Sequence, residues 1–125
     1  MPNHKIAAIL STLLLTTTAY AVDEVTPMGV CKDISIIAKE IMIARQAGKP
    51  LSETLPNALA QFGEMQKRYE IEPFEEGNEA ITVLVMAAYD IPTYSTEGNQ
   101  RREISEFENQ VFAECYKGMA SKSDE

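Results

Sequence analysis

The sequence predicts an all-α protein, a small bundle of four helices stapled by one disulfide that joins the first helix to the last. Three observations support this fold class. Apolar residues recur at spacings of three and four, the period of an amphipathic helix. Short stretches with proline or glycine separate the periodic segments. Two cysteines, Cys31 and Cys115, lie near opposite ends of the chain that follows an N-terminal leader.

The leader, residues 1–21, has the three parts of a secretory signal peptide. Lys5 supplies positive charge, residues 6–15 are an apolar core, and Ala19 and Ala21 form a small-x-small cleavage site. The apolar core is too short to span a bilayer, although an N-terminal membrane anchor is the alternative interpretation. We therefore expect residues 22–125 to form a single helical domain, periplasmic or secreted, with no stable membrane insertion after cleavage.

The first helix is expected to run from Gly29 until Gly48 and Pro50 stop it. Arg45 and Lys49 would lie at its C-terminal end, where positive charge complements the helix dipole. Its apolar stripe consists of residues at helical spacing, namely Cys31, Ile34, Ile37 or Ala38, Ile41 and Ala44, widened by Ile36 and Ile43.

The second helix is expected to open at Ser52 or Thr54, because Pro56 is tolerated only near a first turn. Residues 70–77 are predicted to be a loop, since proline and glycine interrupt them and they hold four glutamates with no base. The inner face of the second helix would comprise Leu55, Leu59, Phe62, Met65 or Gln66, and Tyr69.

The third segment is nearly all apolar over residues 81–88. Its β-branched residues would permit a strand. A capping Asn78 before Glu79, together with the alanines, favours instead a helix that is buried on most sides. Pro92 would end it.

Ser95 or Thr96 should cap the fourth helix, with Glu97 in its first turn and Lys117 and Gly118 at its end. Its inner face is expected to comprise Ile104, Phe107, Val111, Cys115 and Tyr116, then Met119.

The cysteines are expected to pair, because an even number in an exported chain indicates a disulfide. Cys31 would lie in the first turn of the first helix and Cys115 in the last turns of the fourth, so the bond fits antiparallel packing of those helices. The cysteines are 84 positions apart, and closing so long a loop stabilises a fold by about 4–5 kcal/mol in chain-entropy terms. A redox-active or metal-binding pair is the alternative, although no C-x-x-C is present.

The residues needed for most catalytic chemistries are missing. The only histidine, His4, lies in the leader, which removes Ser-His-Asp and Cys-His mechanisms and histidine-containing zinc sites. No nucleotide-binding glycine motif and no calcium loop can be recognised. We expect no catalytic residue, no metal and no cofactor, hence no enzyme. The one remaining enzymatic route is glycoside hydrolysis by two carboxylates.

Several polar and aromatic residues are candidates for binding a partner, although each has a structural alternative. Arg45 could complement the end of the first helix, and Arg101 and Arg102 could pair with Glu97 and Glu106 at helical spacing. The segment 87–98 could be only a corner between two helices. Met42, Met65, Met86 and Met119 are expected in the core, with an adaptable binding surface as the alternative. The candidate partner-binding residues are Arg45, Tyr89, Asp90, Tyr94, Arg101 and Arg102.

Three features together carry a resemblance: a cysteine soon after the leader, "IAKEIMIARQAGKPLSE", and "AAYDIPTYSTEGNQRREISEFENQVFAECY". In these the chain resembles a loose group of small exported single-disulfide helical proteins of Gram-negative bacteria and their phages and prophages. Residues 60–78 are not matched. The resemblance implies an envelope-located helical protein with a paired cysteine, and it implies no activity. The architecture is also similar in class to acid-stress periplasmic chaperones.

The formal net charge of −8 argues against nucleic acid and anionic membranes as partners. We expect an exported, non-enzymatic protein that binds another protein, with a basic partner suiting the charge. An inhibitor, an immunity protein or a phage-exclusion factor would act in this way at the envelope. The alternatives are an acid-activated periplasmic chaperone and, last, a carboxylate-dependent hydrolase of cell-wall glycan.

Overall fold

The computed structural model describes residues 24–123, which form four α-helices. The helices are α2 (Pro27–Gln46), α3 (Leu51–Arg68), α4 (Glu75–Tyr89) and α5 (Glu97–Ser123). No strand occurs among these residues, so the predicted four-helix, all-α class is confirmed. The predicted signal peptide lies outside the described residues.

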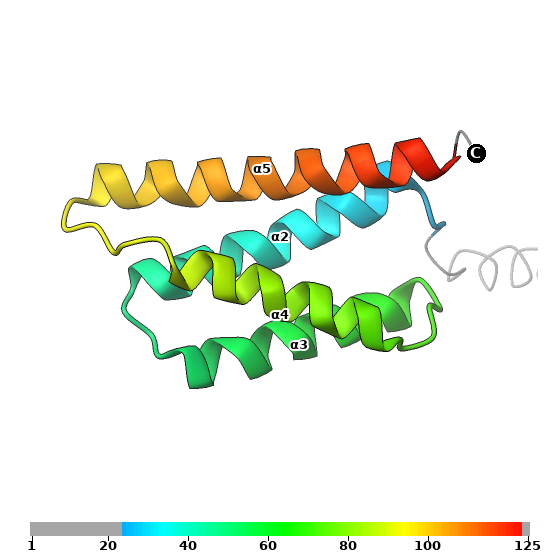
Figure 1. The fold of residues 1–125 in the computed structure, drawn as a ribbon, viewed down its shortest axis with the longest axis horizontal. Helices are drawn as coiled ribbons and strands as arrows, with labels where there is room; N and C mark the ends of the chain where they lie inside the picture. Colours follow the sequence, from blue (N-terminus) through cyan, green and yellow to red (C-terminus); the bar gives the residue numbers. More distant parts are fainter. Residues whose placement is uncertain (1–23, 124–125) are drawn as a thin grey trace, which may run out of the picture.

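Helix α2 is the centre of the bundle. It packs along α5 on one side and against α3 and α4 on the other, while α3 and α4 pack against each other (Figure 1). Helix α5 contacts mainly α2, and its contacts with α3 and α4 are sparse. The bundle is therefore open between α4 and α5.

The predicted disulfide is confirmed. Cys31 and Cys115 are bonded, with their Cα atoms 5.6 Å apart. The bond joins the first turns of α2 to the C-terminal part of α5, which lie side by side because these two helices are antiparallel (Figure 1).

Local signals explain the helix boundaries. The side-chain Oγ1 of Thr26 accepts a hydrogen bond from the Gly29 N–H at 3.0 Å and Pro27 follows as the first helical residue, so α2 begins earlier than predicted. Gly48 has φ 77° just after α2, the left-handed conformation that favours glycine. Thr96 caps α5, and its Oγ1 accepts from the Asn99 N–H at 3.3 Å, which confirms one of the two predicted caps.

Three further boundaries differ from those expected, although the start of α3 lies within three residues of its predicted position. Helix α3 begins at Leu51, and Pro56 lies inside it. Helix α4 begins at Glu75 rather than after Asn78, because two glutamates in its first turn complement the helix dipole. Helix α5 continues through Gly118 to Ser123, since one glycine in an otherwise favourable segment weakens a helix without ending it.

The prediction that α4 is buried on most sides was also wrong. Its buried residues are Gly77, Ile81, Val85 and Ala88, which form one stripe. Val83 is 68% exposed and Met86 47% exposed. The physical reason is that α5 covers α2 rather than α4, so the rest of the apolar surface of α4 has no helix over it.

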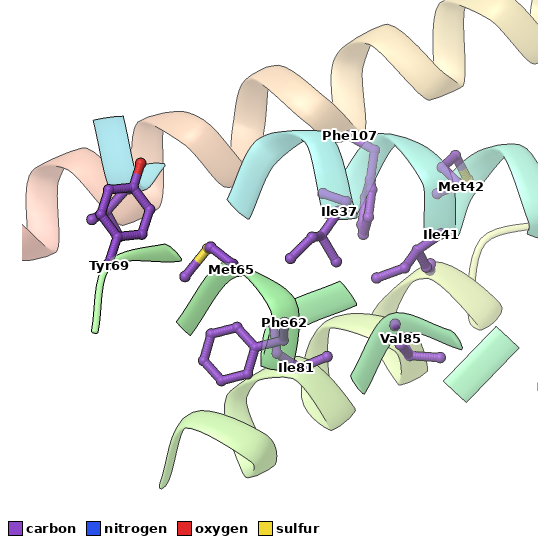
Figure 2. Packing of buried hydrophobic residues seen from close by; sticks show 13 residues of the cluster. Ile37, Ile41, Met42, Phe62, Met65, Tyr69, Ile81, Val85 and Phe107 are labelled. Atoms are coloured by element: carbon purple, nitrogen blue, oxygen red, sulfur yellow. The ribbon is translucent and has the colours of Figure 1, made fainter. Parts of the chain in front are cut away.

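The core lies between α2, α3 and α4. Ile41 and Met42 of α2 and Val85 of α4 are among the largest fully buried side chains. Figure 2 shows Ile37 and Ile41 pointing from α2 towards α3 and α4. Among the described side chains of α5, Phe107 is the only hydrophobic residue that is fully part of this core.

Gly77 is required by close packing at the start of α4. An added Cβ would lie 2.7 Å from Cζ of Phe74 and 2.9 Å from Cε2 of Phe62. Phe62 is buried and cannot move aside freely. Gly77→Ala should therefore lower the free energy of unfolding by about 1–3 kcal/mol, as overpacking does, measured by urea denaturation.

Gly63→Ala in α3 is the matched control. Its Cβ would meet nothing within 4 Å, so better helix propensity should raise stability by about 0.5–1 kcal/mol. The packing account of Gly77 fails if both variants change stability in the same direction.

Candidate functional site

The predicted corner around residues 87–98 is built by hydrogen bonds and ring contacts within the chain. The guanidinium of Arg45 lies 5.1 Å from the ring centroid of Tyr89, and its Nε donates to the Ile91 carbonyl at 2.8 Å. The Tyr89 hydroxyl donates to the Lys49 carbonyl at 2.6 Å and lies 2.7 Å from Oγ1 of Thr54. Arg45 and Tyr89 thus hold the end of α4 against the end of α2.

Gln46 completes this corner. Its Nε2 donates to the Pro92 carbonyl at 3.0 Å, and its Oε1 accepts from the Tyr94 N–H at 2.9 Å. Gln100 then donates to the Tyr94 carbonyl at 2.6 Å. Gln100 was not among the residues expected at this corner, because a polar residue near the start of a helix gives no periodic signal of the contact it will make.

The other candidate residues lie at the same helix junction or just after it. Asp90 is exposed at the C-terminal cap of α4. Arg101 pairs with Glu97 at 3.1 Å, as predicted from their spacing. Arg102 donates to Asn99 Oδ1 at 3.1 Å. The corner is therefore held together by its own residues, and contact with a partner at these positions stays a prediction.

A large hollow of the described surface lies between α4 and α5. It is an apolar groove of about 900 Å³, which we call the α4–α5 groove. Leu84 and Ala87 line one wall, Phe107 and Val111 the other, and Ile34 and Met65 are among the residues of α2 and α3 that also line it. No sequence signal identifies it, because it results from the packing of α5 on α2 instead of α4.

One polar side chain in the groove lacks a partner. Gln66 of α3 lines the groove, is 4% exposed, and its buried Nε2 has no hydrogen-bond partner among the residues that the structure describes. A buried amide donor without a partner costs about 1–3 kcal/mol. The sequence placed Met65 or Gln66 on the inner face, and both are buried there.

The walls of the groove carry negative charge. Glu76 of α4 and Glu114 of α5 are exposed residues of its lining, and the described lining residues include no lysine or arginine. Helix α4 has no basic residue in its whole length. Along α5, Glu103 and Glu106 precede Gln110 and Glu114 at helical spacing on the same side.

The methionines divide between core and surface. Met42 and Met65 are buried, as predicted. Met86 is exposed on α4, contrary to that prediction. Met119 is partly buried in the groove lining, where its sulfur lies 3.5 Å from Cys31 Sγ. The expectation of a core position therefore holds for Met42 and Met65 but not for Met86, and a binding surface formed by methionines stays a prediction.

The groove offers apolar contacts, two exposed carboxylates, and one amide group without a partner among the described residues. The described residues hold no group of three or more His, Cys, Asp or Glu side chains that could bind a metal, and both cysteines are in the disulfide. The general acid of a glycoside hydrolase typically lies in an apolar pocket, whereas Glu76 and Glu114 are exposed.

No helix among residues 24–123 has the length and hydrophobicity that a membrane span requires.

No protein-family model matches the chain, and no curated protein or solved structure is significantly similar to it.

Proposed function

We propose that this protein is exported and acts, without catalysing a reaction, by binding another protein through the α4–α5 groove. The observation that carries the proposal is the groove itself, about 900 Å³ of apolar hollow in a small bundle. Large apolar patches on soluble proteins commonly mark interaction sites. An inhibitor, an immunity protein or a phage-exclusion factor at the envelope would work in this way.

The disulfide supports the export part of this proposal. Disulfides persist in oxidising compartments such as the periplasm and are rare in the cytosol, and the Cys31–Cys115 bond has its predicted pairing. A periplasmic or secreted location, with cleavage after Ala21, is the form of export that we propose.

The binding proposal predicts that blocking the groove abolishes capture of a partner. Gly118 lines the groove, is exposed, and an added Cβ there would meet nothing within 4 Å. Gly118→Trp should fill this part of the groove and reduce capture of the partner by at least about tenfold, equivalent to about 1.4 kcal/mol. The full chain is exported, purified from the periplasm, immobilised and exposed to periplasmic extract at low and high salt.

Gly63→Trp is the matched control, because Gly63 also lies within a helix with open space around it but does not line the groove. It should capture the partner as the wild type does. Equal capture by both tryptophan variants would contradict the proposal. So would the absence of any partner whose capture weakens at high salt.

An acid-activated chaperone is the second candidate, and the methionines of the groove favour it, since Met-lined surfaces accept varied apolar clients. Carboxylates ordinarily titrate near pH 4, so acid would remove the negative charge of the chain and expose more apolar surface. A chaperone should suppress aggregation of unrelated proteins at pH 2–3, about one to two units below the usual pKa of carboxylates. A specific binding protein should not.

A further inference from the structure

We infer that the occupant of the α4–α5 groove is an amphipathic helix of the partner protein, apolar on one face and lined by lysine or arginine on its flanks. The inference rests on the proposed function and names the chemistry of the partner. It follows from the shape of the groove, the charge of its walls and the unpaired amide of Gln66.

The shape of the groove suits one helix. Its α5 wall extends over residues 107–119, which is about 18 Å at the helical rise of about 1.5 Å per residue. A helix of about three turns has this length. In a four-helix bundle each helix packs against two neighbours, whereas α5 packs mainly against α2. An added helix between α4 and α5 would supply the second neighbour that α5 lacks.

The lining provides the contacts that such a helix uses. Leu84, Phe107 and Val111 present apolar side chains from both walls, which receive anchors spaced by three and four residues in helix-in-groove recognition. Met119 is only partly buried in the lining, and its unbranched side chain suits contact with side chains of varied shape.

The charge of the walls selects among three occupants. A fatty acid or an anionic phospholipid would place its headgroup beside Glu76 and Glu114 and find no cation among the described residues of the lining. A second copy of this chain would bring two acidic walls together. A helix with basic flanks instead meets opposite charge on both sides, which speeds association and sets the orientation.

Gln66 adds a requirement at the apolar face of the partner helix. Its buried Nε2 has no acceptor among the described residues, so a serine, asparagine or glutamine oxygen facing α3 would satisfy it once the amide turns into the groove. A polar contact of this kind within an apolar groove fixes the register of the bound helix, because a misplaced acceptor leaves the donor unpaired.

The test uses designed helical peptides of about 16 residues, slightly longer than the groove. The first has an apolar stripe and lysine flanks, the second the same stripe with glutamate flanks, and the third lysine flanks with a scrambled stripe. Each is titrated into the exported, disulfide-bonded protein by calorimetry. The first peptide should bind at least about tenfold more tightly than the other two. Its affinity should fall as the salt concentration rises from about 50 to 500 mM.

Two variants locate this binding. The double variant Glu76→Gln with Glu114→Gln should bind the first peptide several-fold more weakly, and this binding should depend less on salt, because the opposite charges are lost. The control double variant, Glu53→Gln with Glu64→Gln, changes α3 outside the groove lining. It should leave both the affinity and its salt dependence unchanged. Gly118→Trp should abolish binding of the first peptide.

Other outcomes would overturn the inference. These are equal affinity for the lysine and glutamate peptides, binding to phosphatidylglycerol vesicles in place of the lysine peptide, or concentration-dependent dimerisation that Gly118→Trp prevents. If extract yields a groove-dependent partner whose cross-linked segment is not a basic amphipathic helix, the inference fails and the proposed function stands. If no extract protein depends on the groove, the proposed function fails whatever the peptides do.

Discussion

Replacing Cys31 and Cys115 together with alanine should lower the free energy of unfolding by about 2–5 kcal/mol. The bond closes a loop over 84 positions, so its loss returns much conformational freedom to the unfolded chain. The folded state is also affected, because α5 packs mainly against α2 and the bond joins these two helices. Changing both residues leaves no unpaired thiol to form other disulfides.

Urea denaturation followed by far-UV circular dichroism measures this effect. The wild type treated with a thiol reductant is the matched control and should unfold at nearly the same urea concentration as the double variant. Hydrogen exchange should show the largest loss of protection in α5. A double variant as stable as the oxidised wild type would show that the bond contributes nothing to the fold.

Ile41→Ala should lower the free energy of unfolding by about 2–5 kcal/mol, the range found when a large core side chain is truncated. Ile41 is 2% exposed and lies in the central cluster between α2, α3 and α4 (Figure 2). Removing its outer carbons loses buried apolar surface and leaves a cavity among residues that cannot all close around it.

Ile43→Ala is the control on the same helix. Ile43 is 38% exposed, so the same truncation should cost about 1 kcal/mol or less. Both variants should show the wild-type dependence of stability on urea concentration. Equal losses at the two positions would contradict the placement of the core on one side of α2.

The four helices were predictable because helices depend on short-range patterns, and the packing of the first helix beside the last followed from the two cysteines. The spacing of apolar residues identified all four helices, and the compartment expected from the leader identified the disulfide. The boundaries were less predictable, since they depend on competition between weak local effects. A glycine such as Gly118 can end a helix or lie within one, and here α5 continues past it. Glutamates such as those before Gly77 occur both in loops and in the first turn of a helix, and here they begin α4.

The candidate site could be predicted only in part. Arg45, Tyr89 and Tyr94 were singled out, and the structure brings all three together at one corner. The α4–α5 groove was not foreseen. The apolar residues 81–88 indicated a helix surrounded by others, because a sequence records that a side chain is apolar but not whether a neighbouring helix covers it. Whether α5 covers α4 depends on the direction in which α5 continues after the corner.

The claim that the groove is the partner's contact surface can be tested most directly in the cells that produce the protein. A photo-cross-linking amino acid replaces Ala87, an exposed residue of the groove, or Ser52, an exposed residue of α3 outside it. After irradiation, the account predicts one discrete adduct from position 87, lost when Gly118→Trp is added, and none from position 52. An adduct from position 52 alone, or from position 87 regardless of Gly118→Trp, would contradict it.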